Sequence, residues 1–170
     1  MVVIKTERLI LRKLTTKDAE FIIRLLNEPA FLRYIGDKGV RTMDDARQYI
    51  LNGPVDSYKR YGFGLYLVEL KNEGSPIGIC GLVKRPTLTH PDVGFAFLSS
   101  HWSKGYAAES ASAVVTYGRD VLGLTRILAI TSPDNHSSIN VLKKIGLRSE
   151  GMVKLFENEP ELELFISDIK

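Results

Sequence analysis

Residues 102–109 read Trp-Ser-Lys-Gly-Tyr-Ala-Ala-Glu and join an expected strand over residues 93–98 to an expected Ala-rich helix from about residue 106 to 122. A glycine and small residues at a helix start leave several backbone N–H groups pointing at one spot, where the helix dipole adds positive charge. Lys104 supplies a further cation. The stretch therefore predicts a phosphate or pyrophosphate site, although an ordinary helix start has the same pattern.

Strands and helices alternate on both sides of this junction. Before it we expect one N-terminal strand in residues 2–11, helices opened by Thr15-Asp18 and Thr42-Asp45 capping boxes, and a hairpin of residues 63–70 and 77–83. The first helix should end before Pro29 and the second at residues 52–54. After the junction we expect a strand at 125–131, a helix at 137–145 and a strand at 161–166.

This element order predicts an α/β (α+β) fold with a mixed sheet. The chain has 170 residues, of which 44% are hydrophobic and 25% charged, values typical of a globular protein. Because this length suits one domain and no linker or repeat interrupts it, we expect a single domain over residues 1–170. The composition excludes collagen-like, coiled-coil and disordered chains.

The cysteine content and the charge indicate the cellular compartment and limit the classes of binding partner that we expect. Cys80 is the only cysteine, which excludes an intramolecular disulfide and a Cys-based zinc cluster and fits a reducing compartment. No apolar run reaches the roughly 18 residues of a membrane span, and residues 1–12 do not resemble a signal peptide. We expect a cytoplasmic protein without a membrane partner. The net charge of +3 is scattered along the chain, so a nucleic-acid partner is not expected.

Several common sites are absent from the sequence. It contains neither a G-x-G-x-x-G nor a G-x-x-x-x-G-K-[ST] motif, which argues against a Rossmann dinucleotide site and a P-loop. No G-x-S-x-G elbow of a serine hydrolase is present. The three histidines lie far apart, so we expect no metal site. Cys80 lies in the middle of an expected strand, where a small buried side chain is a better interpretation than a nucleophile.

A second polar cluster follows the strand at 125–131. Residues 132–138 read Ser-Pro-Asp-Asn-His-Ser-Ser and open the next helix. Their hydroxyl and amide groups can hold the polar chain of a ligand or supply a proton. Simple helix capping is the alternative interpretation.

Three ordered segments together resemble one branch of the GNAT N-acetyltransferase superfamily, which includes the ribosomal-protein N-terminal alanine acetyltransferases. Residues 6–12, Thr-Glu-Arg-Leu-Ile-Leu-Arg, are similar to its T-E-R-L-x-L-R opening, and residues 102–109 to its W-G-K-G-Y-A-x-E coenzyme A loop. Residues 135–151 are similar to its N-x-x-S…K-x-G-F…E-G segment. The resemblance implies a mixed, strongly twisted central sheet flanked by helices, whose central strands splay to admit the pantetheine arm of acetyl-CoA.

The resemblance also assigns roles to residues. It implies that the backbone of the coenzyme loop cradles the pyrophosphate, through Ser103, Lys104, Gly105, Tyr106 and Ala107. Phe97 and Leu98 would pair with the pantetheine amides, and a backbone N–H there would hold the oxyanion. Asn135 and Ser138 would face the coenzyme near its sulfur. Leu142 stands where many members carry a tyrosine acid, so Ser138 becomes the candidate acid and Asn135 its catalytic neighbour.

The implied activity is an acetyl-CoA-dependent N-acetyltransferase, in which a primary amine attacks the thioester directly without a metal. The acceptor stays open between a protein N-terminus and a small amine. The general base stays open among Glu157, Asp92, Glu69 and water. A monomer and a homodimer are both compatible with the sequence. The alternatives are a non-catalytic acyl-CoA-binding regulatory domain on the same fold and a nucleic-acid or ribosome-associated module.

Overall fold

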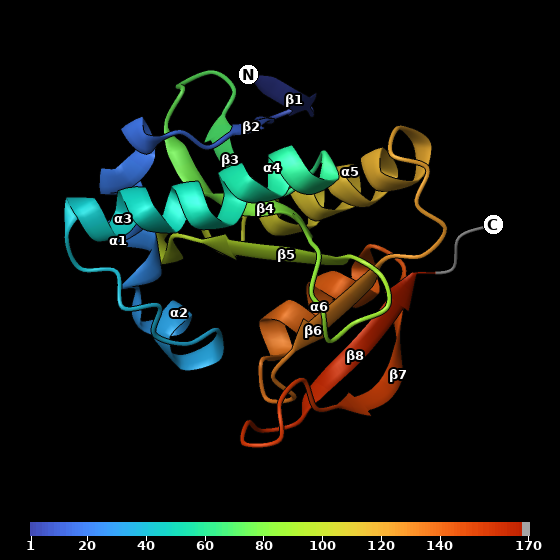
Figure 1. The fold of residues 1–170 in the computed structure, drawn as a ribbon. Coiled ribbons are helices and arrows are strands. Elements are labelled where there is room, and N and C mark those ends of the chain that lie inside the picture. The colour runs from blue at the N-terminus through green and yellow to red at the C-terminus, as the bar shows by residue number, and fades with distance from the viewer. Residues whose placement is uncertain (168–170) are drawn as a thin grey trace.

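A single eight-stranded sheet runs through the computed structural model, which describes residues 1–167 (Figure 1). The strand order is β1-β2-β3-β4-β5-β6-β8-β7. The strands are β1 Val2–Lys5, β2 Leu9–Lys13, β3 Leu65–Leu70, β4 Pro76–Val83, β5 Asp92–Phe97, β6 Leu128–Thr131, β7 Leu147–Val153 and β8 Leu162–Ser167. β5 and β6 are parallel, and all other neighbours are antiparallel. The predicted mixed sheet is confirmed; residues 168–170 of the expected domain lie outside the described part.

Helices cover both faces of the sheet. They are α1 Ala19–Leu26, α2 Pro29–Tyr34, α3 Met43–Ile50, α4 Asp56–Tyr61, α5 Tyr106–Asp120 and α6 His136–Lys144. Figure 1 shows α3 and α4 on the near face and α5 on the far face. Side chains alternate between the faces as strand geometry requires. Tyr66 and Cys80 belong to the core beneath α5, whereas Leu67 and Ile79 belong to the core beneath α1 and α3.

Both predicted capping boxes are present. The Thr42 hydroxyl accepts from the N–H of Asp45 at 3.1 Å, and the Asp45 carboxylate accepts from the N–H of Thr42 at 3.1 Å. Thr15 and Asp18 form the same reciprocal pair at a 3-10 turn that leads into α1. These side chains satisfy N–H groups that a helix start leaves without an acceptor, which explains why a short sequence pattern locates the two helices.

The prediction for the two prolines near the first helices was incomplete. Pro29 ends α1 as expected but also occupies the first turn of α2, where its missing N–H is harmless. The expected helix end at residues 52–54 is wrong. The chain continues through a π-helical turn, Leu51–Val55, which accommodates Pro54, and then forms α4. Gly62, with φ of 79°, ends α4 instead.

Two strand predictions also need correction. The expected single N-terminal strand is a hairpin of β1 and β2, because the chain turns back at residues 6–8, where the N–H of Thr6 donates to the carbonyl of Leu9. β7 was not predicted. Its residues from Arg148 to Met152 are exposed, so this edge strand lacks the apolar alternation by which strands are recognised.

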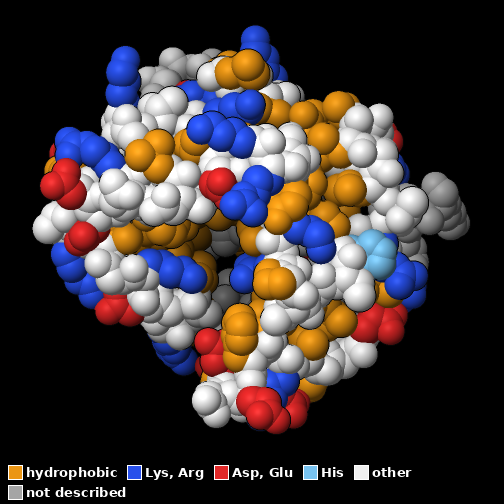
Figure 2. All heavy atoms as spheres, in the orientation of Figure 1, with side chains coloured by type: hydrophobic (Ala, Val, Ile, Leu, Met, Phe, Trp, Pro, Cys, Tyr) orange, Lys and Arg blue, Asp and Glu red, His pale blue; other side chains and the backbone are white. Residues whose placement is uncertain are grey.

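The sheet opens between β5 and β6. In the described chain their register contains one pair, Asp92 with Leu128, after which the strands diverge. Figure 2 shows the molecule hollowed in the middle of this face, with Lys and Arg side chains around the rim. β5 runs toward the loop of residues 102–105, so the opening and the predicted phosphate site belong to one region.

Gly81 should be sensitive to substitution because β3 lies against it. A Cβ at Gly81 would lie 2.0 Å from the carbonyl oxygen of Gly64, a backbone atom that cannot rotate away. We expect Gly81→Ala to destabilise the protein by about 3 kcal/mol, the upper range for overpacking, in urea unfolding. Gly53→Ala is the control, since a Cβ there meets nothing within 4 Å. Equal stability of the two variants would contradict the close approach of β3 and β4.

Candidate active site

The loop before α5 has the geometry of an anion site. Ser103 has φ of 61° and Gly105 has φ of 84°, so the backbone twists twice through the left-handed region before the helix begins. The first helical bond runs from the N–H of Glu109 to the carbonyl of Gly105 at 3.0 Å. The preceding N–H groups have no acceptor in the helix, and no side chain of residues 1–167 caps them. This end of a 15-residue helix can therefore bind a phosphate.

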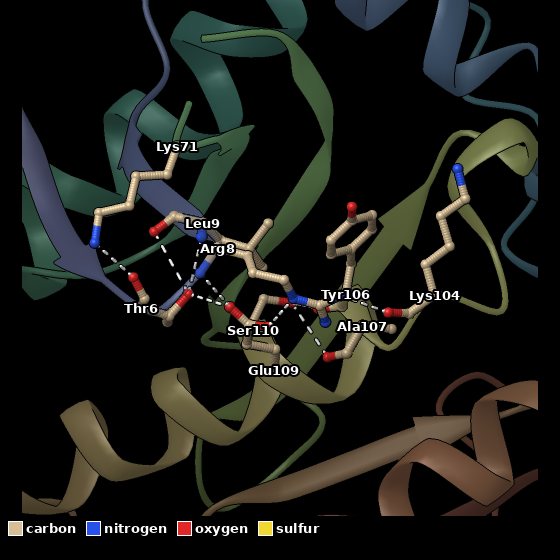
Figure 3. Close-up of polar contacts among 9 residues, drawn as sticks. All are labelled: Thr6, Arg8, Leu9, Lys71, Lys104, Tyr106, Ala107, Glu109 and Ser110. Atoms are coloured by element: carbon tan, nitrogen blue, oxygen red, sulfur yellow. Dashed lines mark hydrogen bonds and ion pairs between the residues drawn. The ribbon is translucent and has the colours of Figure 1, made fainter. Parts of the chain in front are cut away.

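A polar cluster holds this loop from the side of the β1–β2 turn (Figure 3). The Glu109 carboxylate accepts from the Thr6 hydroxyl at 2.5 Å, from the Arg8 N–H at 2.9 Å and from Arg8 Nε at 2.7 Å. Arg8 Nη1 donates to the carbonyl of Lys104 at 2.9 Å, and its guanidinium lies 4.5 Å from the centre of the Tyr106 ring. The segments 6–8 and 104–109 thus form one unit.

At the end of β5 the backbone groups of Phe97 and Leu98 point to opposite sides of the strand. The N–H of Leu98 donates to Ile77 in β4, and its carbonyl accepts from His101, both at 2.9 Å. Backbone groups of successive strand residues point in opposite directions, so those of Phe97 face away from β4. The Phe97 carbonyl accepts from the indole Nε1 of Trp102 at 2.9 Å. The N–H of Phe97 is therefore the group that this strand end offers to a ligand between β5 and β6.

Asn135 and Ser138 lie together at the start of α6, and both are half-buried. Asn135 Oδ1 accepts from the N–H of Ser138 at 3.3 Å, so the capping interpretation holds for the asparagine side chain. The cap of α6 is the Asn135 side chain and does not use the Ser138 hydroxyl. Leu142, one turn further on, is buried in the core.

The three carboxylates considered as bases occupy different surroundings. Asp92 lies at the closed end of β5, about 17 Å along the strand from Phe97, and its carboxylate accepts from Arg85 Nε at 2.8 Å. Burial raises the pKa of Asp92, and Arg85 opposes that rise. Glu69 on β3 pairs with Arg12 at 3.2 Å. Glu157 is exposed between β7 and β8. Asp92 thus lies at the opposite end of β5 from Phe97, and the strand register places Glu69 two strands across from the end of β5.

Cys80 lies in the core beneath α5 and is fully buried. Burial raises the pKa of its thiol to about 12, so it carries no thiolate at neutral pH. Among residues 1–167 no group of three or more His, Cys, Asp and Glu side chains could hold a metal ion. In the same residues no helix combines the length and apolar character needed to cross a membrane.

Sequence reasoning missed a cavity of about 400 Å³ between α2 and the β5–α5 loop. Its lining comprises Glu28, Pro29, Ala30, Arg33, Tyr34, Ser99 and Trp102. The Glu28 carboxylate accepts from the N–H of Ser99 at 2.7 Å, which fixes the start of α2 to the end of β5. Pro29 was the available signal, since proline is common in the first turn of a helix.

Comparisons with known proteins agree with this geometry. Residues 8–148 match the sequence model of the acetyltransferase (GNAT) domain. The chain is 30% identical over 156 residues to the uncharacterized N-acetyltransferase YoaA of Bacillus subtilis (strain 168), covering 91% of this chain and 87% of that protein. It is also 30% identical to a GNAT-family acetyltransferase from Bacillus anthracis, with a TM-score of 0.80 over 98% of this chain and 97% of that one.

A third protein shares the fold at lower identity. It is RimL, a ribosomal L7/L12 alpha-N-protein acetyltransferase solved in complex with coenzyme A, with 18% identity and a TM-score of 0.84 over 99% of this chain and 98% of that one. The match to the GNAT domain covers most of the sequence, and the chain belongs to the GNAT acetyltransferase family. It is an acetyltransferase enzyme, as the resemblance implied.

Glu109 should make the stability of the fold sensitive to acid. Burial raises the pKa of Glu109, but hydrogen bonds from Thr6 and Arg8 outweigh burial and lower it below 4.5. A carboxyl with a lowered pKa stabilises the fold above its unfolded pKa, and this contribution is lost as the pH falls through the folded pKa. We expect Glu109→Gln to lower the Tm at pH 7 and to reduce the Tm loss between pH 6 and pH 3. Parallel Tm curves for variant and wild type would contradict the assignment.

Proposed function

We propose that the enzyme transfers an acetyl group from acetyl-CoA to a primary amine by direct attack. The observation that carries this proposal is the uncapped start of α5 beside the opening between β5 and β6. A diphosphate suits the free N–H groups of the helix start. An extended amide chain suits the free edge of a strand. The CoA complex of RimL, on the same fold, supports the choice of coenzyme.

The residues of the loop fit a diphosphate. At Gly105 a Cβ would lie 3.2 Å from Arg8 Nη2, so a larger residue would crowd the guanidinium and narrow the approach to the backbone. The Lys104 side chain extends away from Arg8 (Figure 3), which leaves its ammonium available to a phosphate. Ser103, Gly105, Tyr106 and Ala107 would contribute backbone N–H groups.

The end of β5 and the start of α6 would carry the chemistry. The nitrogen lone pair of a neutral amine attacks the thioester carbonyl carbon, and the carbon–sulfur bond then breaks. We assign the oxyanion to the N–H of Phe97, since the backbone groups of Leu98 already bond within the chain. We assign to the Ser138 hydroxyl the donation of a proton to the departing thiolate, and the serine regains a proton from water; Asn135 fixes the turn that carries Ser138.

Water would remove the proton from the attacking amine. Asp92 and Glu69 are each paired with an arginine, and Glu157 is exposed in the β7–β8 connection. We propose that the acceptor enters beside α2, where the cavity is lined by the aromatic rings of Tyr34 and Trp102 and by the carboxylate of Glu28. A protein N-terminus and a small amine both satisfy this chemistry. We also propose that the enzyme is cytoplasmic and that it is a monomer or a homodimer.

Coenzyme binding tests the proposal directly. At a hundredfold excess over Kd, acetyl-CoA should stabilise the protein by about 2.7 kcal/mol and raise its Tm. Gly105→Glu should abolish binding in calorimetry, because it places a side chain and a negative charge at the phosphate site. Gly123→Glu is the matched control. It sits past the other end of α5 with φ of 71°, so it adds the same charge and a similar backbone strain.

Two outcomes would contradict this prediction. A wild-type protein whose Tm is unchanged by millimolar acetyl-CoA would refute the coenzyme. Undiminished CoA affinity in folded Gly105→Glu would show that the loop is not the phosphate site.

Ser138→Ala should lower kcat by about tenfold to a hundredfold while the KM for acetyl-CoA changes little. This is the low end of general-acid contributions, because a serine is a weak acid. The Tm should stay unchanged, since the capping group is Asn135 Oδ1 and not the serine hydroxyl. Ser137→Ala, an exposed neighbour in the same turn, is the control. Wild-type kcat in the Ser138 variant, measured with an amine panel and thiol release, would refute the acid.

A further inference from the structure

We propose that Arg8 is a positioning residue for the coenzyme, holding the phosphate-binding loop before α5 in its binding conformation. The inference rests on the proposed function, because the ligand that the loop would receive is the diphosphate of acetyl-CoA. Arg8 lies in the turn between β1 and β2, close to a hundred residues before the loop in sequence. It is not expected to touch the acetyl group.

The guanidinium contacts the loop at three successive places (Figure 3). Nη1 donates to the carbonyl of Lys104 at 2.9 Å, the planar group lies over the Tyr106 ring, and Nε donates to the Glu109 carboxylate at 2.7 Å. These contacts fall before the helix, at its first residue and at the end of its first turn. A rigid planar fork can make all three at once, whereas a lysine ammonium on a flexible stem cannot.

The loop needs an external support because its backbone is strained. Ser103 adopts φ of 61°, in the left-handed region that residues other than glycine rarely occupy. Such a conformation persists only where its surroundings fix it. The bond from Arg8 to the carbonyl of Lys104 acts on the residue that follows Ser103. Without it, we expect the loop to relax and its N–H groups to lose their common direction.

Charge gives Arg8 a second effect on the site. Glu109 places a carboxylate in the first turn of α5, close to where a phosphate would bind. Thr6 and Arg8 direct three donors at that carboxylate, and Arg8 neutralises its charge. In a variant without the guanidinium, an uncompensated negative charge would face an anionic coenzyme.

The solvent exposure of the Arg8 side chain argues that its main role is in coenzyme binding and not in folding. The Arg8 side chain is 43% exposed and that of its partner Glu109 is 19% exposed, so solvent screens the pair from the arginine side and limits its contribution to global stability. The core of this region is formed by other residues, such as Leu9 and Val114, which are fully buried. The effect of Arg8 should therefore be larger on coenzyme affinity than on the stability of the free protein.

The test compares two acetyl donors that differ in the diphosphate. In Arg8→Gln we expect the KM for acetyl-CoA to rise about tenfold, the scale of one lost charge-assisted contact, with kcat at saturation unchanged. The kcat/KM for S-acetylpantetheine, which has no diphosphate, should equal that of the wild type. Arg119→Gln at the other end of α5 removes the same charge from an exposed pair and should change neither value.

Two further variants test the mechanism. Arg8→Lys keeps the charge but loses the fork, so it should restore only part of the acetyl-CoA affinity. Arg8→Gln combined with Glu109→Gln should bind acetyl-CoA better than Arg8→Gln alone, because the uncompensated carboxylate is gone. A double variant that binds worse than Arg8→Gln would contradict the charge argument.

The outcomes separate this inference from the proposed function. Wild-type KM for acetyl-CoA in folded Arg8→Gln would overturn the positioning role, and so would an equal loss with both donors. Absence of CoA binding by the wild type would instead refute the coenzyme itself.

Discussion

The divergence of β5 from β6 is the constraint on which the site depends. In the described chain these parallel neighbours share the pair of Asp92 and Leu128, and beyond it the backbone groups on their inner edges find no partner in the sheet. Buried backbone groups must be paired elsewhere. Trp102 meets this need for the carbonyl of Phe97. The N–H of Phe97 requires another acceptor, and a ligand that carries amides and carbonyls can supply it.

Helix α2 is hydrogen-bonded to both sides of the opening in the sheet. At its start Glu28 bonds to Ser99 after β5, and at its end the carbonyl of Tyr34 accepts from the hydroxyl of Ser132 after β6 at 3.4 Å. This six-residue helix therefore connects the two sides of the opening. Because it also lines the cavity beside Trp102, a change in α2 would alter both the width of the opening and the surface offered to an acceptor.

The elements of the fold that the sequence predicts correctly are those that depend on residues close together in the sequence. Both capping boxes depend on residues three apart, and the start of α5 follows from glycine and small residues in a row. Hydrogen bonds between residues far apart in the sequence cannot be predicted from such local patterns. Nothing in the sequence indicates that the N–H of Leu98 belongs to Ile77, or that Arg8 reaches Lys104. β7 was missed because its surface is polar, and the π-helical turn because proline ordinarily ends a helix.

The affinity that the proposed coenzyme site needs would explain why the loop is supported by β1 and β2. A helix end contributes about 0.3–1 kcal/mol per charge at an exposed site, whereas micromolar affinity corresponds to about 8 kcal/mol. Several N–H groups must therefore point at the phosphates together before binding, since ordering them during binding would reduce the affinity. Arg8 and Glu109 fix the backbone on both sides of Gly105. The two sequence motifs, at residues 6–12 and 102–109, are thus best understood as one site, because the first fixes the geometry that the second presents.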